Sequence, residues 1–487
     1  MDFRTDTGCK NQRARAAILV LPMLDTRMIV QKFLDTKMQV HPDVVRYLSE
    51  RGDLGLIDRI IENLPGDTVV VSVKNIPGVI PDRDGNRFAT ESRCEILKGS
   101  AGSSGNSGCI QDYLHYFRDR YNRLGSIIRS RSIPLPIEGL LKNSRFRQET
   151  STIMGLVLDT KTTTNGHRIA ELEDPSGSVA VLFHKDRPVF SEGESLIPDE
   201  VVGVRGQLSS DGRLFFAESL LRPDIPISHA PFRSETPGTA VLISDIHVGS
   251  NTFLEEEWNR FADWLDNSDA SYLMIAGDLV DGIGVYPNQE QELTIKNIYE
   301  QYDVFASMMR DLPSRITIIV GPGNHDVVRA AEPQPAIPQE FVGGLPGNCL
   351  PVENPALISL QGVMVQMYHG RSIDDMISLI PGATYDNVAP MMIGMLQRRH
   401  LAPTYGKRTP IAAIREDHLL IDPVPEVLHT GHVHIMALSE YRGTLCVNTG
   451  AWQGQTTFQK QMNIHPTPAR AVVLDLQTLK PQVIDFN

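Results

Sequence analysis

A chain of 487 residues is too long for one compact core, so we expect several domains. Its formal net charge of −13 argues against a protein that holds nucleic acid with its whole surface, so a phosphodiester substrate would need bound cations, a basic partner or a small basic patch. No apolar stretch approaches the roughly 20 residues of a membrane span, and the five scattered cysteines argue against a disulfide framework and fit a reducing cytoplasm.

The N-terminal part of the chain is predicted to contain a helical module and a linker. Residues 1–27 show no periodicity, and we interpret them as a disordered tail or a mis-assigned start. Residues 28–66 place apolar side chains at three- and four-residue steps, which predicts a small helical module suited to docking. Residues 67–145 are predicted to be a linker, since the run from Lys98 to Gly108 is rich in glycine and serine.

An amphipathic helix is predicted near the end of that linker, over Tyr113–Arg131. Its aromatic side chains are expected to face inward and its arginines outward, namely Arg118, Arg120, Arg123, Arg129 and Arg131. We favour a solvated charged face for this helix over a nucleic-acid contact.

Residues 146–230 change to short alternating apolar runs separated by turns such as Asn165-Gly166. The runs predict five strands: Ile153–Leu158, Ile169–Leu172, Val179–Phe183, Val201–Val204 and Leu214–Phe216. Five short strands in so small a segment predict a barrel of the OB-fold class. Because aromatic residues are sparse here, we favour a protein-binding or spacer role over binding of single strands.

Residues 238–487 have the sequence pattern of an α/β domain, in which apolar strands alternate with helical stretches. The predicted strands are Ala240–Ile243, Tyr272–Ile275, Ile316–Val320, Val363–Met367, Val427–Leu428, Leu445–Val447 and Ala471–Leu474, with helices over Glu255–Leu265 and Ile295–Met309.

Polar motifs follow five of these strands. In chain order they contain Asp245 and His247; Asp278 and Asp281; Asn324, His325 and Asp326; His369; and His432 and His434. Because the carboxyl ends of the strands in an α/β sheet meet at one rim, we expect a single site there.

The residue types of these motifs fit a binuclear metal centre. Carboxylate, imidazole and amide oxygen together suit manganese, iron or zinc, and the lack of cysteine argues against a structural zinc site. A carboxylate that bridges two cations lets them serve the attacking and leaving oxygens of a phosphoester together. Each motif alone has an ordinary explanation, such as a turn, a helix cap or a buried histidine, but their joint occurrence favours metal.

The order D-x-H, G-D-x-x-D, G-N-H-D, a lone histidine and G-H-x-H resembles the calcineurin-like metallophosphoesterase superfamily. The strings SDIHVGS, AGDLVDG, GPGNHDVVRAAEPQP and TGHVH are similar to those of the small subunits of archaeal DNA polymerase D, which are related to the B-subunits of eukaryotic replicative polymerases. The resemblance covers Met28 to Asn487. It implies a multidomain α/β chain in which a helical module and an OB-fold β-barrel precede a two-sheet metallophosphoesterase domain.

The resemblance also implies a role for each motif residue. The expected metal ligands are Asp245, His247 and His434 for one ion, Asn324, His369 and His432 for the other, and Asp278 as the bridge. His325 is expected over the substrate phosphate, stabilising charge or protonating the leaving oxygen, and Asp326 is expected to orient its ring. Asp281 is not a ligand in the family pattern, so we expect it to contact a ligand or to cap a helix.

The implied function is proofreading by a 3′–5′ exonuclease subunit of a replicative DNA polymerase, with two divalent metal ions. Manganese is favoured, and iron, zinc and magnesium stay open. Synthesis would reside on a large catalytic partner subunit, through which the chain would also meet DNA and the sliding clamp. The residues themselves support only phosphoester hydrolysis, because the motifs bind metal and phosphate, not bases.

Three other functions stay open. They are a stand-alone repair nuclease of the same superfamily, a small-molecule phosphomonoesterase, and a structural polymerase subunit with a vestigial site. The helical module and the barrel argue against the first, and the complete ligand set argues against the third. Activity on p-nitrophenyl phosphate with none on oligonucleotides would favour the second.

Overall fold

The computed structural model describes residues 26–36, 38–51, 57, 60–61, 70–71, 93–98, 109–143, 149–412 and 414–487. The chain divides into two compact units, residues 1–91 and 92–487. Most of the residues for which the sequence predicts a tail or a linker lie outside the described part, although Thr26 and Arg27 already belong to the first helix. Among the described residues, no helix is long and apolar enough to cross a lipid bilayer.

The first unit contains the predicted helices. The elements of its described part include α1 (Thr26–Asp35), β1 (Gln39–Val40), α2 (Pro42–Arg51) and β2 (Val70–Val71). Its buried core consists of Ile29, Phe33, Val44, Leu48, Ile57, Ile60 and Val71. The parallel pairing of β1 with β2 was not predicted, because two residues are too few to carry an alternating signal.

The second unit contains a closed five-stranded barrel with the strand order β4-β5-β6-β8-β7. Its strands are β4 (Ser151–Thr162), β5 (Arg168–Asp174), β6 (Gly177–Phe183), β7 (Val201–Leu208) and β8 (Leu214–Leu221), accompanied by α5 (Ile137–Lys142) and α6 (Phe190–Glu194). The five predicted strands and the barrel are confirmed. The assignment of this barrel to the OB-fold class stays a prediction.

Two six-stranded sheets follow in the same unit. The first, in the order β12-β11-β10-β9-β18-β19, is built from β9 (Thr239–Ile243), β10 (Tyr272–Ala276), β11 (Thr317–Gly321), β12 (Cys349–Pro351), β18 (Arg470–Asp475) and β19 (Pro481–Asp485). The second, in the order β16-β17-β15-β14-β13-β3, is built from β3 (Cys94–Lys98), β13 (Ala356–Leu360), β14 (Val363–Met367), β15 (Val427–Thr430), β16 (Ala437–Tyr441) and β17 (Thr444–Asn448).

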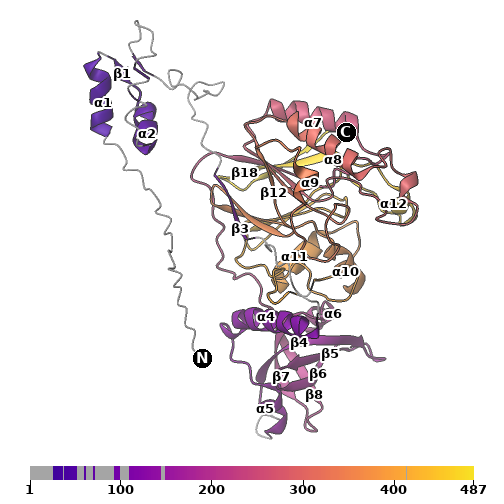
Figure 1. Cartoon of the computed structure of the whole chain (residues 1–487). Coiled ribbons are helices and arrows are strands. Elements are labelled where there is room, and N and C mark those ends of the chain that lie inside the picture. The colour runs from indigo at the N-terminus through magenta and orange to yellow at the C-terminus, as the bar shows by residue number, and fades with distance from the viewer. Residues whose placement is uncertain are drawn as a thin grey trace, which may run out of the picture. The chain divides into compact units, whose positions relative to one another are not determined.

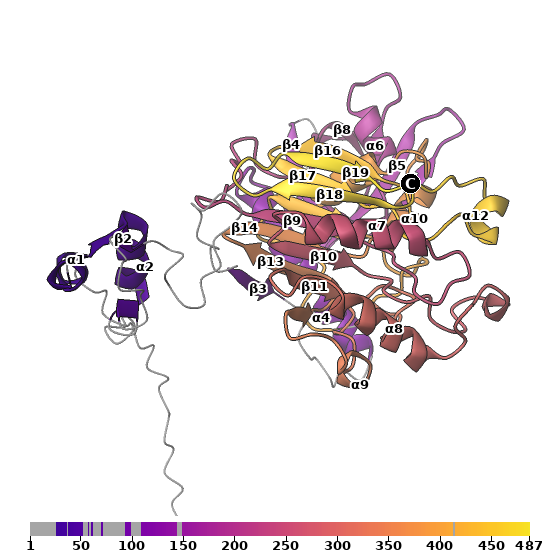
Figure 2. The ribbon, with the colours of Figure 1, turned by 90° about the horizontal axis from the view of Figure 1, so that it is seen from above.

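Helices cover the outer faces of the two sheets (Figures 1 and 2). They are α7 (Glu255–Asp266), α8 (Ile298–Arg310) and α9 (Gln339–Val342) on the first sheet, α10 (Ser372–Leu379) and α11 (Ala389–Arg398) on the second, and α12 (Thr457–Gln461) in a C-terminal loop. Strand β9 shows the layering, since Val241 and Ile243 pack beneath α7 while Ala240 and Leu242 face the second sheet. All seven strands and both helices predicted for this domain are confirmed.

Strand β3 lies in the segment that was predicted to be a linker. It pairs antiparallel with β13 and thereby completes the edge of the second sheet. Its short sequence mixes charged and apolar residues, and its partner is distant in the chain, so the local pattern does not reveal it.

Helix α4 (Ile110–Arg129) is the predicted amphipathic helix, and it lies between the barrel and the α/β layers (Figure 1). The prediction that Arg120 faces outward is wrong, because its side chain is fully buried. Its Nε donates to Asp417 Oδ2 over 2.8 Å, and its Nη1 donates to the carbonyl oxygens of Pro403 and Asp199. Its spacing of four residues from the buried Tyr116 and Leu124 places it on the inner face, where only its charge argued for exposure, and the loop that carries Asp417 supplies the partner for that charge.

Replacing Arg120 with methionine is expected to lower the free energy of unfolding by about 3–5 kcal/mol, because it leaves the buried Asp417 carboxylate without its guanidinium. Urea unfolding followed by circular dichroism measures the change. The matched control is Arg118→Met on the exposed face of α4, which should stay within about 0.5 kcal/mol of the wild type. Equal stability of the two variants would contradict a structural role for the ion pair.

Candidate metal centre

The motif residues lie at one edge of the two sheets, just beyond the ends of five strands. Each motif begins two or three residues after its strand: Asp245 after β9, Asp278 after β10, Asn324 after β11, His369 after β14 and His432 after β15. Strands β9, β10 and β11 run parallel in the first sheet, and β14 and β15 run parallel in the second. Their carboxyl ends therefore deliver the side chains to a common place.

Asp245, His247 and His434 form a first cluster, in which the candidate ligand atoms lie within 4.8 Å of one another. The Nε2 atoms of His247 and His434 are 3.1 Å apart, and His434 Nε2 is 3.6 Å from Asp245 Oδ1. All three side chains are buried. One carboxylate and two imidazoles that converge in this way can hold a divalent cation.

Asp278, His369 and His432 form a second cluster. Asn324 joins it, since its Oδ1 is 3.1 Å from His369 Nε2. Asp278 lies between the two clusters: its Oδ2 is 3.3 Å from His369 Nε2 and 3.8 Å from His247 Nε2. A single carboxylate can therefore reach both cation positions, as a two-metal site requires.

Acceptors behind the rings orient two of these histidines. His247 Nδ1 donates to Asp281 Oδ1 over 3.0 Å, and His369 Nδ1 donates to the carbonyl oxygen of Ala276 over 2.9 Å. In its neutral form, each ring then turns the lone pair of Nε2 toward the clusters, as in metal-ligating histidines. The donor set therefore fits two divalent cations.

The charges of the second cluster also favour a bound cation. Burial opposes ionisation of Asp278, but the nearby charges of His369 and His325 outweigh it and hold the pKa of Asp278 well below its ordinary value. Burial lowers the pKa of His369, but the Asp278 carboxylate outweighs this and raises it to about 10. The protein thus places a positive charge beside Asp278 by protonating His369, and a cation bound there would replace that proton.

The backbone around the clusters is strained. Five of the seven predicted ligands have φ between 50° and 72°, namely Asp245, His247, Asp278, His432 and His434. Such angles are costly for residues other than glycine and tend to occur at functional sites. Glycine is required beside them, since a Cβ at Gly323 would lie 2.1 Å from Asp278 Oδ1 and one at Gly431 would lie 2.4 Å from Asp245 Oδ2.

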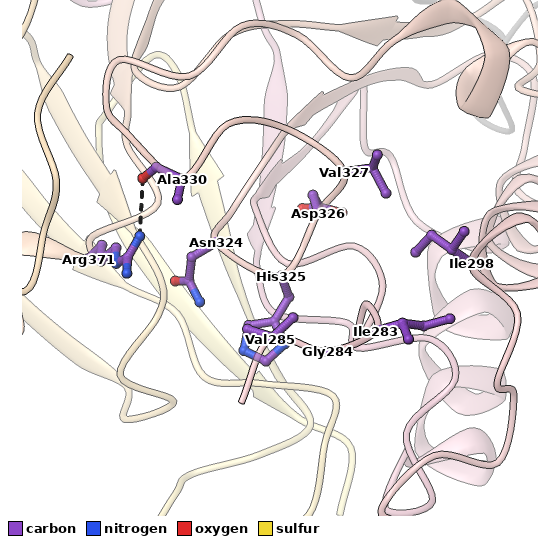
Figure 3. Close-up of a pocket in the computed structure, with 10 residues that line it drawn as sticks. All are labelled: Ile283, Gly284, Val285, Ile298, Asn324, His325, Asp326, Val327, Ala330 and Arg371. Carbon is purple, nitrogen blue, oxygen red and sulfur yellow. Dashed lines mark hydrogen bonds between the residues drawn. The ribbon is translucent and has the colours of Figure 1, made fainter. Parts of the chain in front are cut away.

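His325 lies where the clusters meet a cavity (Figure 3). Its Nδ1 donates to the carbonyl oxygen of Asp281 over 2.7 Å, and its Nε2 is 4.0 Å from Asp278 Oδ2. Its backbone N–H donates to Asp278 Oδ1 over 2.8 Å. The ring is therefore held with Nε2 toward the clusters.

The prediction that Asp326 orients this ring is wrong. The buried Asp326 carboxylate instead accepts hydrogen bonds from the backbone N–H groups of Gly323 and Leu279 and from the hydroxyl of Tyr302. Burial, together with the charge of Asp278, raises the pKa of Asp326 to about 6. Asp326 thus holds the loops that carry Asn324 and Asp278, because a buried carboxylate needs these donors.

Several polar residues behind the ligands were not predicted. His432 Nε2 lies 3.3 Å from Asp374 Oδ2, and His434 Nδ1 lies 3.0 Å from Gln459 Nε2. Gln289 and Gln453 both donate to the carboxylate of Asp281. Only Gln459 has a sequence signal, since Thr456-x-x-Gln459 is a capping box, and this signal predicts the start of α12 but not the contact with His434.

Asp281 contacts the predicted ligand His247 through a hydrogen bond, as expected for a residue behind the ligands. Replacing it with asparagine is expected to weaken binding of Mn²⁺ by about 10–100-fold, because the ring of His247 loses the carboxylate that fixes its tautomer. Isothermal titration calorimetry measures this affinity. Asp263→Asn on the exposed face of α7 is the control, and equal affinities for both variants would contradict the orienting role.

Known proteins similar to this chain belong to DNA polymerases. The family of DNA polymerase alpha/epsilon B-subunits matches residues 240–435. The DNA polymerase II small subunit of Halobacterium salinarum is 42% identical over 415 residues, which cover 84% of this chain and 81% of that protein. The DNA polymerase II small subunit of Archaeoglobus fulgidus is 37% identical over 484 residues, which cover 93% of this chain and 97% of that protein.

Among solved structures, one described as a novel archaeal phosphodiesterase aligns with 50% of this chain and 98% of its own, at 12% identity and a TM-score of 0.29. That score is too low to show a common fold. The sequence identities, in contrast, extend over most of the chain and confirm the resemblance to archaeal polymerase small subunits. The chain belongs to the family of DNA polymerase II small subunits.

Proposed function

We propose that the chain is the 3′–5′ proofreading exonuclease subunit of an archaeal family D DNA polymerase and that it hydrolyses DNA phosphodiesters at a binuclear metal centre. The observation that carries this proposal is the position of Asp278, with one carboxylate oxygen 3.3 Å from His369 Nε2 and 3.8 Å from His247 Nε2. A subunit with a purely structural role has no need for two buried ligand clusters on strained backbone, so their presence supports an active site.

Seven side chains would hold the two cations: Asp245, His247 and His434 for one, Asn324, His369 and His432 for the other, and Asp278 for both. When bound, the cations would acidify water and neutralise the charge that develops on the phosphoryl oxygens. Manganese suits the mixture of carboxylate, amide and imidazole donors, and so do iron and zinc. Magnesium suits it less, because it prefers oxygen ligands.

In the proposed reaction, the bond between phosphorus and the 3′ oxygen of the penultimate nucleotide breaks. Water adds its hydroxyl group to phosphorus, and the 3′ oxygen takes up a proton, so the terminal nucleotide leaves as a monophosphate. His325 is placed to hold this proton on Nε2, because its Nδ1 is fixed on the Asp281 carbonyl and its Nε2 faces the clusters. Asp326 supports the reaction indirectly by fixing the loops of Asn324 and Asp278.

A large catalytic subunit is the proposed partner, since the relatives are named small subunits of a polymerase. The net charge of −13 supports this, because a basic partner would supply the surface that attracts DNA. DNA, and the sliding clamp through the assembled polymerase, are the further proposed partners, in the cytoplasm. In this proposal the metallophosphoesterase domain spans residues 238–487, and the helical module (28–66) and an OB-fold (146–230) serve docking or spacing.

The proposal is tested by digesting a 5′-labelled DNA primer with a mismatched 3′ end in Mn²⁺, using the chain alone and with the large subunit added. Stepwise shortening from the 3′ end that EDTA prevents is the expected result. Absence of shortening in both preparations would overturn the exonuclease and point to a structural subunit. Hydrolysis of p-nitrophenyl phosphate without digestion of DNA would point to a phosphomonoesterase.

A further inference from the structure

A cavity of about 450 Å³ opens beside the metal centre, and its walls differ in chemistry. Asn324 and His325 line it on the side of the clusters. Figure 3 shows Arg371 on one side of these two residues and Ile298 and Val327 on the other. A volume of this size accommodates a small ligand such as a nucleoside, and the walls offer it both a cation and an apolar surface.

Arg371 is the cationic side chain in this wall. It precedes α10 and follows His369 by two residues, so the strand end that places a candidate ligand also places the guanidinium. Its Nη1 donates to the carbonyl oxygen of Ala330 over 3.1 Å, which fixes the side chain at the cavity. A guanidinium has five N–H donors in a planar arrangement that matches the oxygens of a phosphate, and the bond to Ala330 uses one of them.

The opposite wall is aliphatic and partly open to solvent. Ile283 and Val285 line the cavity although 46% and 39% of their surfaces are exposed, and Ile298 and Val327 continue the same wall. Apolar side chains exposed at the mouth of a polar site are typical of a surface that a ligand covers. A nucleobase presents a flat face that such a wall can contact without selecting a sequence.

The position of His325 sets which nucleoside would enter. If His325 protonates the 3′ oxygen that leaves, the cavity that it lines lies on the side of the penultimate nucleoside. The next phosphodiester in the 5′ direction is attached to that nucleoside. In a chain with net charge −13, beside a carboxylate-rich centre, a second phosphate needs a local cation.

We infer that this cavity is a subsite for the penultimate nucleoside, in which Arg371 binds the phosphate 5′ of that nucleoside and the aliphatic wall contacts its base. The inference rests on the proposed exonuclease and extends it. Arg371 acts as a positioning and specificity residue, because it would bind a phosphate that does not react. The subsite favours single-stranded or frayed 3′ ends, since a base must be free of its pair to lie against the wall.

The test combines two substrates with two forms of the protein. TpT has only the scissile phosphodiester, whereas pTpT adds a phosphate at the position assigned to Arg371. The wild type in Mn²⁺ is expected to prefer pTpT by about tenfold in kcat/KM. Arg371→Met is expected to lose this preference while hydrolysing TpT and bis(p-nitrophenyl) phosphate within about twofold of the wild-type rate.

A binding measurement without divalent metal provides a second readout. Fluorescence anisotropy with labelled oligo(dT) is expected to show about tenfold weaker binding for Arg371→Met. The slope of log affinity against log salt concentration is expected to fall by about 0.7, the value for one phosphate contact on a single strand. Arg310→Met is the matched control, since Arg310 also donates through Nη1 to a carbonyl oxygen but lies on α8 outside the cavity wall.

The outcomes separate this inference from the proposed function. A preference for pTpT that survives in a folded Arg371→Met, or an unchanged salt slope, would overturn the subsite and leave the exonuclease standing. The subsite would also be overturned, without contradicting the exonuclease, if the wild type cleaves bis(p-nitrophenyl) phosphate and hydrolyses TpT and pTpT with equal kcat/KM. If the wild type cleaves no phosphodiester either alone or with the large subunit added, the proposed function fails, and the binding measurement still decides whether Arg371 holds a phosphate. Thermal unfolding checks that each variant is folded.

Discussion

Replacing Asp278 with asparagine is expected to lower the turnover of the proposed exonuclease by a factor on the order of 10³ or more, because one substitution disturbs both proposed cation positions. The Oδ2 atom of Asp278 faces His369 and His247 together, so this carboxylate brings a negative charge to both proposed cation positions. Asparagine has nearly the same shape, and its amide oxygen can still accept the backbone N–H of His325. The loop should therefore keep its conformation while the bridging charge is lost.

The amount of bound Mn²⁺ distinguishes this explanation from unfolding. Titration calorimetry on Asp278→Asn is expected to show loss of at least one of the two bound ions, with thermal unfolding no less cooperative than in the wild type. Asp303→Asn on the exposed face of α8 is the control and should retain both ions and full turnover. Two ions bound with wild-type affinity in Asp278→Asn would overturn the bridging role.

The sequence predicts well which strands and motifs build this site, because each strand and the motif after it are encoded by neighbouring residues. Each of the strands β9, β10, β11, β14 and β15 is a short apolar run, and each is followed at once by a polar motif. Parallel strand order brings together the motifs of β9, β10 and β11 in the first sheet and those of β14 and β15 in the second. The packing of the two sheets, which only the resemblance implies, joins the two sets. The clusters Asp245–His247–His434 and Asp278–His369–His432 are therefore grouped as the resemblance implies.

The remaining features depend on contacts between distant segments. Arg120 lies four residues from both Tyr116 and Leu124 on the buried face of α4, but its charge predicts exposure. The partner that allows its burial, Asp417, lies in a distant loop. Asp326 adjoins His325 in the chain, but its carboxylate turns toward Tyr302 on α8. Gln459 contacts His434 from α12, whose sequence signal is limited to the capping box at its start. Side-chain direction at such points is set by tertiary packing, which a local pattern does not encode.

The substitution His325→Ala is expected to lower turnover on DNA by about 10²–10⁴-fold while both metal ions stay bound. The imidazole is not among the seven proposed ligands, although it lies close enough to His247 and Asp281 to form a group with them. Its Nδ1 is fixed on the carbonyl of Asp281, so its loss leaves the seven proposed ligands in place. Single-turnover digestion of a labelled primer measures the rate, and calorimetry with Mn²⁺ measures the ions. His465→Ala, at an exposed position outside the site, is the control.

A change of leaving group decides how His325 acts. If its Nε2 protonates the 3′ oxygen, a thymidine ester with a p-nitrophenyl leaving group needs no such proton, so His325→Ala should slow that ester less than about tenfold. If the imidazolium instead stabilises charge on the phosphoryl oxygens, DNA and the ester should be slowed alike. Equal turnover of His325→Ala and the wild type on both substrates would remove His325 from the reaction. The assignment of the cavity to the penultimate nucleoside depends on the first result, because only a proton donor to the 3′ oxygen must lie on that side of the phosphate.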